Sequence, residues 1–278
     1  MKVTVYTDPG CQFGFNAYGQ ELQLLWHYGH SVEVEWRMIG LSERTSSFEE
    51  IGLTADLVER TRERLAGLYG MPMGLEPLTR VPSTLDACRA YVGARTQDPD
   101  HAPALLRNLF RRAQSDQQHL DELETIDAAA HDAGLPAGSI ESWLADGEVE
   151  AALDADMAAT RDPLPEALAL PHKLVRIDGG FRYSSASAVF EDENRRVVAA
   201  GFQPFAVYEI AVANVAPHIE AREAPEAVDE VLAWAPYPLA TAEVAALRGV
   251  EIDEARGELE RAGAKFTPSG IDGYWVAD

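Results

Sequence analysis

Basic residues are scarce in this chain. Its 278 residues include 46 acidic but only 23 basic side chains, which gives a formal net charge of −23. Only three of the basic residues are lysines: Lys2, Lys173 and Lys265. Such an excess of negative charge repels phosphate backbones, so the composition argues against a nucleic-acid partner. We interpret the excess as a solvated acidic surface.

Long apolar runs are also missing. No stretch approaches the roughly 18–20 apolar residues that span a bilayer, and the opening residues MKVTVYTDPG lack the pattern of a secretory signal peptide. We therefore expect a cytoplasmic protein that does not act on membranes. The hydrophobic content of 46% is typical of a folded globular protein.

Cysteine is nearly absent, and so are metal-binding motifs. The two cysteines are Cys11 and Cys88, and a structural disulfide between them is not the first expectation in a cytoplasmic protein. The seven histidines are scattered, and no Cys or His pair has the spacing of a zinc site. No glycine-rich nucleotide-binding motif occurs. We predict no metal site.

The N-terminal residues show a strand–helix–strand pattern. Residues 3–7 alternate as a strand, residues 16–29 place apolar side chains at helical spacing, and residues 32–38 alternate again. Gly29 ends the predicted helix. A helical crossover of this length joins parallel strands, so we predict a βαβ unit.

Helical patterns then dominate, and strands return later. The helical segments are TADLVERTRERLAGLYG, STLDACRAYVGAR, APALLRNLFRRAQ, LDELETIDAAAHDAG, SIESWLADG and EVEAALDADMAATR. Strand character resumes in HKLVRID, SASAVFE and RRVVAAG, and PFAVYEIAVANVAP reads as a helix. We predict an α/β domain over residues 1–218, whose sheet parts at 1–41 and 171–218 are separated by a helical insertion over about 42–165.

Residues 222–278 are predicted to form a second, smaller unit. Thr241 is positioned to cap a helix over 242–248, a second helix fits 251–262, and KFTPSGIDGYWVAD reads as a hairpin. This order suggests a winged-helix-like module. Because residues 220–278 hold 13 acidic and 5 basic residues, a packing or partner-binding role is favoured over DNA reading.

The stretch DPGCQFGF at residues 8–15 carries a resemblance. A lone cysteine at a strand-to-helix junction, followed by VEVEWRMIGL, STLDACRA and LFRRAQ, resembles the DsbA-like thioredoxin-fold proteins. That group includes FrnE-type dithiol oxidoreductases and, more distantly, 2-hydroxychromene-2-carboxylate isomerases and kappa-class glutathione transferases. The resemblance covers about residues 1–218. It implies a thioredoxin-like fold with a large helical insertion, and chemistry at a thiol.

The resemblance also implies roles for individual residues, because the family's active site usually reads D-P-x-C-P-W-C. After Asp8 and Pro9, Cys11 takes the place of the nucleophilic cysteine, Gln12 and Phe13 follow it, and Gly14 replaces the second, resolving cysteine. The family's cis-proline loop, which faces the thiol, corresponds to RYSSASAVFE. Ser185 lies in that loop, and Ala186 takes the position of the proline.

These assignments lead to expectations for the thiols. A cysteine at a helix N-terminus can have its pKa lowered from about 8.5 to roughly 3.5–7.5, so we expect Cys11 to be a thiolate near neutral pH. A dithiol cycle through the C-x-x-G motif is excluded, because Gly14 offers no second thiol. Cys88 could resolve a mixed disulfide if the insertion lays it over Cys11. Its surroundings, DACRAYV, favour a buried structural cysteine instead.

Other side chains have two readings each. Phe13 and Phe15 either line an apolar substrate groove or pack in the core. Two interpretations also fit Arg107, Arg111 and Arg112. They either attract an anionic ligand or, as is more common for charged residues, form a solvated helix face.

Three functions remain open at this stage. The first is an oxidoreductase with a single active-site thiol, acting in mixed-disulfide exchange or low-molecular-weight thiol chemistry. The second is an isomerase or transferase of the 2-hydroxychromene or kappa type, which depends on a thiol cofactor. The third is a non-catalytic interaction protein on a degenerate thioredoxin scaffold.

An enzyme is favoured, with no covalently bound cofactor and a glutathione-like thiol as candidate ligand. A small thiol, a protein disulfide or a second copy of the chain are the partners considered.

Overall fold

The computed structural model describes residues 1–41 and 54–278. A four-stranded sheet in the order β2-β1-β5-β6 forms its centre. β1 pairs in parallel with β2 and antiparallel with β5, which in turn pairs antiparallel with β6. The strands are β1 Lys2–Thr7, β2 Glu33–Met38, β5 Ser187–Asp192 and β6 Arg195–Ala199. The predicted βαβ unit is confirmed, with helix α1 (Gln12–Tyr28) as its crossover.

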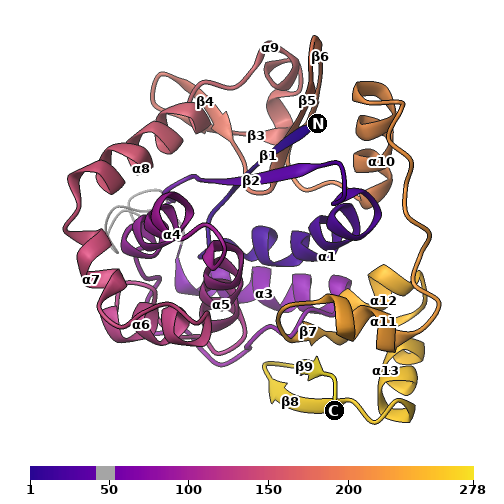
Figure 1. Ribbon diagram of the computed structural model, residues 1–278. Helices are drawn as coiled ribbons and strands as arrows, with labels where there is room; N and C mark the ends of the chain where they lie inside the picture. Colours follow the sequence, from indigo (N-terminus) through magenta and orange to yellow (C-terminus); the bar gives the residue numbers. More distant parts are fainter. Residues whose placement is uncertain (42–53) are drawn as a thin grey trace.

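The predicted helical insertion is present between the two parts of the sheet. In Figure 1 most of its helices lie to the left and lower left of the strands, in purple to pink. The helices are α3 Ala55–Tyr69, α4 Leu85–Gln97, α5 Ala102–Gln114, α6 Leu123–Asp132, α7 Ser139–Leu144, α8 Gly147–Thr160 and α9 Pro165–Leu168. The portion of the predicted insertion at residues 42–53 lies outside the described residues.

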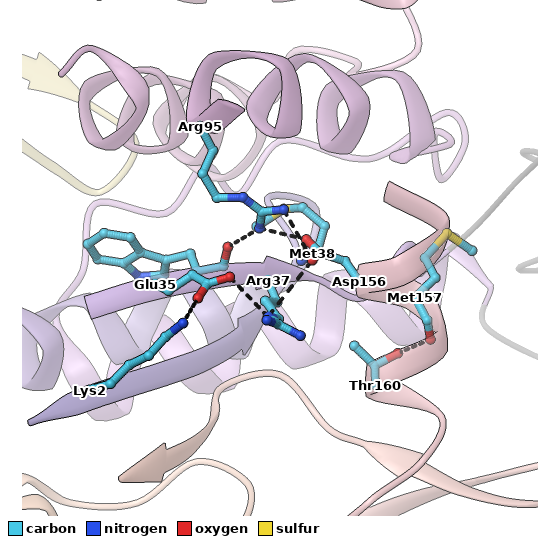
Figure 2. A network of polar contacts seen from close by, with 9 residues as sticks. Lys2, Glu35, Arg37, Met38, Arg95, Asp156, Met157 and Thr160 are labelled. Carbon is cyan, nitrogen blue, oxygen red and sulfur yellow. Dashed lines mark hydrogen bonds and ion pairs between the residues drawn. The ribbon is translucent and has the colours of Figure 1, made fainter. Parts of the chain in front are cut away.

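A polar network fastens the insertion to the edge strand β2 (Figure 2). The Asp156 carboxylate of α8 accepts the Met38 N–H at 3.0 Å and two hydrogen bonds from Arg95 of α4, at 2.7 and 3.1 Å. Arg95 also donates to the Trp36 carbonyl at 2.7 Å. The unpaired edge of β2 is therefore covered by two inserted helices, which protects it from pairing with another chain.

The strand expected at residues 172–178 does not join the main sheet. It follows a short 3₁₀ turn, η1 (Pro171–Lys173), and forms β3 (Leu174–Ile177), which pairs with β4 (Gly180–Tyr183) in a separate hairpin. The turn is made by Gly179, whose φ of 86° is open to glycine without strain. β5, β6 and helix α10 (Phe205–Val215) then complete the main sheet as predicted.

The C-terminal elements lie at the lower right in Figure 1, next to α1. They are α11 Val228–Trp234, β7 Leu239–Ala240, α12 Thr241–Arg248, α13 Ile252–Arg261, β8 Lys265–Ser269 and β9 Asp272–Val276, with the three strands in the order β7-β9-β8. The two helices and the hairpin expected there are present. The assignment of residues 222–278 to a winged-helix-like module stays a prediction.

Thr241 does not cap α12 as expected. The helix begins at Thr241, and the Glu243 carboxylate accepts the Ala240 N–H at 2.7 Å. The Thr241 hydroxyl instead accepts a hydrogen bond from the Trp275 indole at 2.9 Å. The prediction was wrong by one position: the N-cap residue is Ala240, which has no side-chain acceptor, and the Thr241 hydroxyl is already used by Trp275.

Arg107 is not on a solvated helix face. Its side chain is fully buried and forms a two-pronged ion pair with Glu243, so α5 is joined to α12. Arg111 and Arg112 are partly buried, with side chains 31% and 13% exposed, and pair with Asp116 and Asp132. Among the residues that the structure describes, no helix is long and apolar enough to cross a membrane.

Candidate active site

Cys11 occupies the N-cap position of α1, as the motif predicts. Its backbone is extended (φ −86°, ψ 118°), its N–H donates to the Asp8 carbonyl at 2.8 Å, and its carbonyl accepts the first helical bond from Phe15 at 3.0 Å. The side chain is half-buried. The thiol faces the backbone N–H groups of Phe13 and Gly14 and the Ser185 hydroxyl. These donors are those that would stabilise a sulfur anion.

The expected low pKa of this thiol is not found. Burial raises the pKa of Cys11 above its usual value, and the hydrogen bonds from Ser185 and the helix N-terminus only partly oppose this. The charge of Asp8 adds to the increase in the pKa. The helix terminus alone would lower the pKa of Cys11, but the cost of removing a thiolate from water is larger. Cys11 is therefore mostly a protonated thiol at neutral pH.

Gly14 lies where no larger side chain fits. A Cβ atom at this position would come within 2.7 Å of Thr7 Oγ1, 2.8 Å of Ser185 Oγ and 3.1 Å of the Phe110 ring. These neighbours are short or buried side chains with little room to move. The position that the resemblance assigns to a second cysteine is therefore tightly packed.

The loop between β4 and β5 faces the thiol, as the resemblance implies. Ser185 is 8% exposed and its hydroxyl lies 3.3 Å from that of Thr7. Ala186 is fully buried, and the peptide bond between the two residues is cis. Cys11, Gly14, Ser185 and Ala186 thus come together around the end of β1.

Asp8 is the buried acid of this site. Its carboxylate is inaccessible to solvent, and burial raises its pKa above the usual value for an aspartate. It accepts hydrogen bonds from Gly10 N–H (2.9 Å), Leu41 N–H (2.8 Å), the Thr84 hydroxyl (3.0 Å) and the Cys88 thiol (3.4 Å). These donors come from three separate parts of the chain, so Asp8 fixes the loop that carries Cys11 against α4.

The burial predicted for Cys88 is confirmed. The residue is 0% exposed and its thiol donates to Asp8. Burial and the nearby carboxylate raise the pKa of Cys88 well above its usual value. Both cysteines are free thiols. The resolving role considered for Cys88 stays a prediction, and its burial and raised pKa weigh against it.

The two phenylalanines of the motif differ. Phe13 is 41% exposed and lines a cavity of about 380 Å³ with Leu68, Tyr69 and two arginines of α3, Arg60 and Arg64. Phe15 is fully buried and contacts Phe110 in the core, so it is not a groove residue.

Two other residues of the motif are held by their neighbours. Gln12 donates to the Val58 carbonyl at 2.9 Å, and the Pro9 carbonyl accepts from Gln114 at 3.2 Å. Both contacts join the cysteine loop to inserted helices. The motif is therefore rigid on the side away from Phe13.

Arg182 is a residue of this site that sequence reasoning missed. It lies on β4 and donates to the Tyr183 carbonyl at 2.8 Å. Burial lowers the pKa of its guanidinium, while the nearby Cys11 and Asp8 oppose that effect. Arg182 forms no ion pair within the described residues. The sequence could have indicated Arg182 as a site residue, because it lies in the stretch RYSSASAVFE, three residues before Ser185.

A group with metal-ligand side chains lies elsewhere on the surface. His119, Asp121 and Glu122 have ligand atoms within 4.8 Å of one another. Arg80 pairs with both carboxylates, so the group is explained as an ion-pair cluster. The absence of a metal site stays a prediction.

Comparisons with known proteins agree with this geometry. Residues 2–162 match the model of the DSBA-like thioredoxin domain.

Several solved structures are similar to this chain. A putative protein disulfide isomerase from Nitrosomonas europaea is 14% identical, with a TM-score of 0.60 over 76% of this chain and 95% of that chain. A probable DsbA oxidoreductase from Streptomyces coelicolor is 21% identical, with a TM-score of 0.58 over 80% and 93%. The cytosolic disulfide reductase DsbM from Pseudomonas aeruginosa with GSH is 17% identical, with a TM-score of 0.54 over 76% and 98%. A search of curated proteins found no match. The three structures share the fold.

Proposed function

The chain belongs to the family of DSBA-like thioredoxin domains, and we propose that it exchanges disulfides with a low-molecular-weight thiol through the single thiol of Cys11. The observation that carries this proposal is the packing around Gly14. Cys11 has the nucleophile's position at the start of α1, while the position of a second cysteine is held by Gly14, which carries no thiol and is tightly packed. Exchange at this motif must therefore be completed by an external thiol.

The reaction has two balanced steps. The Cys11 thiolate attacks one sulfur of a small disulfide, the S–S bond breaks, and one thiolate leaves and takes up a proton. Cys11 is then in a mixed disulfide. A second small thiolate attacks that disulfide, which releases a small disulfide and returns Cys11 to the reduced state. No further oxidant or reductant is required.

Charge near the thiol favours an anionic substrate. Arg182 is close enough to Cys11 and Asp8 for their charges to affect its pKa, and it has no ion-pair partner in the described part of the chain. A carboxylate of a glutathione-like thiol would supply that partner. The fold of a disulfide reductase whose structure contains GSH is consistent with this choice.

Intact-mass measurement tests the thiol. Reduced protein is incubated with glutathione disulfide at pH 8, and we expect the mass to increase by one glutathionyl group, which reduced glutathione then removes. Cys11→Ser should abolish the adduct, whereas Cys88→Ala should form it at the rate of the unmodified protein. An adduct on Cys88, or none at all, would contradict the proposal and favour a non-catalytic interaction protein.

A pair of disulfides tests the role of Arg182. Arg182→Gln should slow the reaction with glutathione disulfide several-fold and leave the reaction with neutral 2-hydroxyethyl disulfide nearly unchanged. Arg176→Gln is the matched control, because Arg176 is an exposed arginine on the same hairpin. If glutathione binds in calorimetry but forms no disulfide with Cys11, the isomerase or transferase alternative is favoured instead.

A further inference from the structure

A cavity of about 570 Å³ lies at the opposite end of α1 from Cys11. Residues of α1, β2 and the segment around α11 line it, so it lies between the thioredoxin-like sheet and the C-terminal elements. At 1.5 Å per helical residue, Trp26 is roughly 20 Å along α1 from Cys11. The cavity is thus separate from the candidate active site, and its volume suits a small organic molecule.

Aromatic side chains make up much of the lining of this cavity. Three of the five tryptophans in the chain, Trp26, Trp36 and Trp234, line it together with Tyr18 and Tyr237. Trp26 and Trp234 meet edge to face, with ring centroids 5.2 Å apart. Rings at such angles offer flat faces to an inserted ring, which binds by offset or edge-to-face stacking. The walls therefore favour a flat aromatic ligand.

Two polar groups at the cavity lack partners in the described part of the chain. Arg222 is an exposed residue whose guanidinium lies over the Trp26 ring, 3.7 Å from its centroid, with no carboxylate or other hydrogen-bond acceptor among the described residues. Stacking on a ring leaves the N–H groups at the guanidinium edge available to an anion. Tyr18 is only 3% exposed, yet its hydroxyl makes no hydrogen bond with any described residue. This hydroxyl is not one of the fully buried side-chain atoms that lack a partner, so it is open to the cavity and can donate to an acceptor on a ligand.

The charge of the cavity indicates the charge of the ligand. Arg222 lines it, and none of the described residues that line it is an aspartate or a glutamate. A cationic ligand would be repelled by Arg222, whereas a carboxylate could form a two-pronged contact with it.

We propose that this cavity binds a small, flat aromatic carboxylate, whose ring lies among the tryptophans and whose carboxylate contacts Arg222. The Tyr18 hydroxyl donates to a second acceptor on the ligand. Because Trp36 belongs to β2 while Trp234 belongs to α11, the bound molecule contacts both the sheet and the C-terminal elements. This binding does not depend on thiol chemistry at Cys11.

Calorimetry with two matched probes tests the site: 2-naphthoate and its neutral amide, 2-naphthamide. The full chain should bind 2-naphthoate more tightly and show quenching of tryptophan fluorescence. Arg222→Gln should weaken 2-naphthoate about tenfold, the loss of one charge-assisted contact, and leave 2-naphthamide within about twofold. Arg176→Gln, an exposed arginine remote from the cavity, should change neither affinity.

Two further variants test the walls and the hydroxyl. Trp234→Ala should abolish binding of both probes, and Tyr18→Phe should weaken both by a similar factor; circular dichroism checks that each variant is folded. Cys11→Ser should bind as the unmodified protein does, which separates this site from the proposed thiol exchange. The proposal is overturned if neither probe binds at low millimolar concentration, or if Arg222→Gln weakens both probes equally.

Discussion

Arg107 of α5 and Glu243 of α12 form a two-pronged ion pair in which the side chains are 2% and 0% exposed. The Arg107 guanidinium also lies over the rings of Tyr18 and Tyr274, at 4.9 and 5.5 Å from their centroids. The pair therefore joins three regions: the inserted helices, the crossover helix α1 and the C-terminal hairpin. Residues from all three belong to one continuous hydrophobic core.

Removing one partner of this pair should cost far more than removing a surface charge. Glu243→Ala leaves the Arg107 charge buried without a counterion, and we expect the free energy of unfolding to fall by about 3–5 kcal/mol. Urea unfolding followed by circular dichroism measures the change. Asp116→Ala is the control, because Asp116 pairs with Arg111 of the same helix at a partly exposed site; about 0–1 kcal/mol is expected there. Equal losses in the two variants would contradict the assigned role of burial.

The packing around Gly14 predicts that a C-x-x-C motif cannot be restored by one substitution. Gly14→Ala gains up to about 1 kcal/mol in helix propensity, but overpacking costs about 1–3 kcal/mol, so we expect net destabilisation, and more for Gly14→Cys. Thermal unfolding measures it. Combining Gly14→Ala with Ser185→Ala removes one contacting atom and should recover part of the loss. Strictly additive effects of the two substitutions would count against direct contact.

The thiol of Cys11 should react slowly at neutral pH. Because burial raises the pKa of Cys11, the alkylation rate of a Cys88→Ala protein should still be climbing at about pH 8.5, the usual cysteine value. Asp8→Asn removes a nearby negative charge, so it should increase the rate at pH 7.5 several-fold. A rate that levels off below about pH 7 would contradict the raised pKa.

Much of the fold could be predicted from local patterns. The alternation in residues 3–7 and 32–38, with a helical segment between them, was sufficient for a parallel strand pair. The D-P-x-C start placed Cys11 at a helix N-terminus, and the resemblance of RYSSASAVFE to the family's cis-proline loop placed Ser185 near it. These features depend on contacts near in sequence or on a known arrangement of one motif.

Long-range burial could not be predicted in the same way. Arg107 is separated from Glu243 by 136 positions, and its neighbours LFRRAQ read as a charged face, so no local signal marked it as buried. The same holds for Asp8, whose hydrogen bonds reach Leu41, Thr84 and Cys88. The raised pKa of Cys11 follows from such burial. A helix-terminus argument alone therefore gave the wrong direction.

The ionisation of Glu21 should lower the stability of the protein as pH rises. Burial raises the pKa of Glu21 from 4.5 to about 8, although its carboxylate accepts a hydrogen bond from the Trp36 indole at 2.7 Å. The unfolded chain loses this proton at lower pH than the native protein, so the free energy of unfolding falls as pH rises from about 4.5 to about 8. The total is on the order of 5 kcal/mol.

Glu21→Gln isolates this effect, because glutamine keeps the acceptor for Trp36 and cannot ionise. The variant should be more stable than the unmodified protein at pH 8, and the advantage should shrink towards pH 5. Urea unfolding at several pH values measures the difference between the two proteins, in which other titrating groups cancel. Parallel stability curves would show that Glu21 does not titrate in this range.

The closed space around Gly14 also bears on how such a site changes over generations. A larger residue at position 14 would meet Thr7, Ser185 and Phe110, so a single mutation towards C-x-x-C would first lower stability. A compensating change in a neighbour would bring no benefit until the larger side chain was present. Core packing alone can therefore hinder the appearance of a second cysteine at this position. Selection would then act on the reactions that a single thiol can carry out.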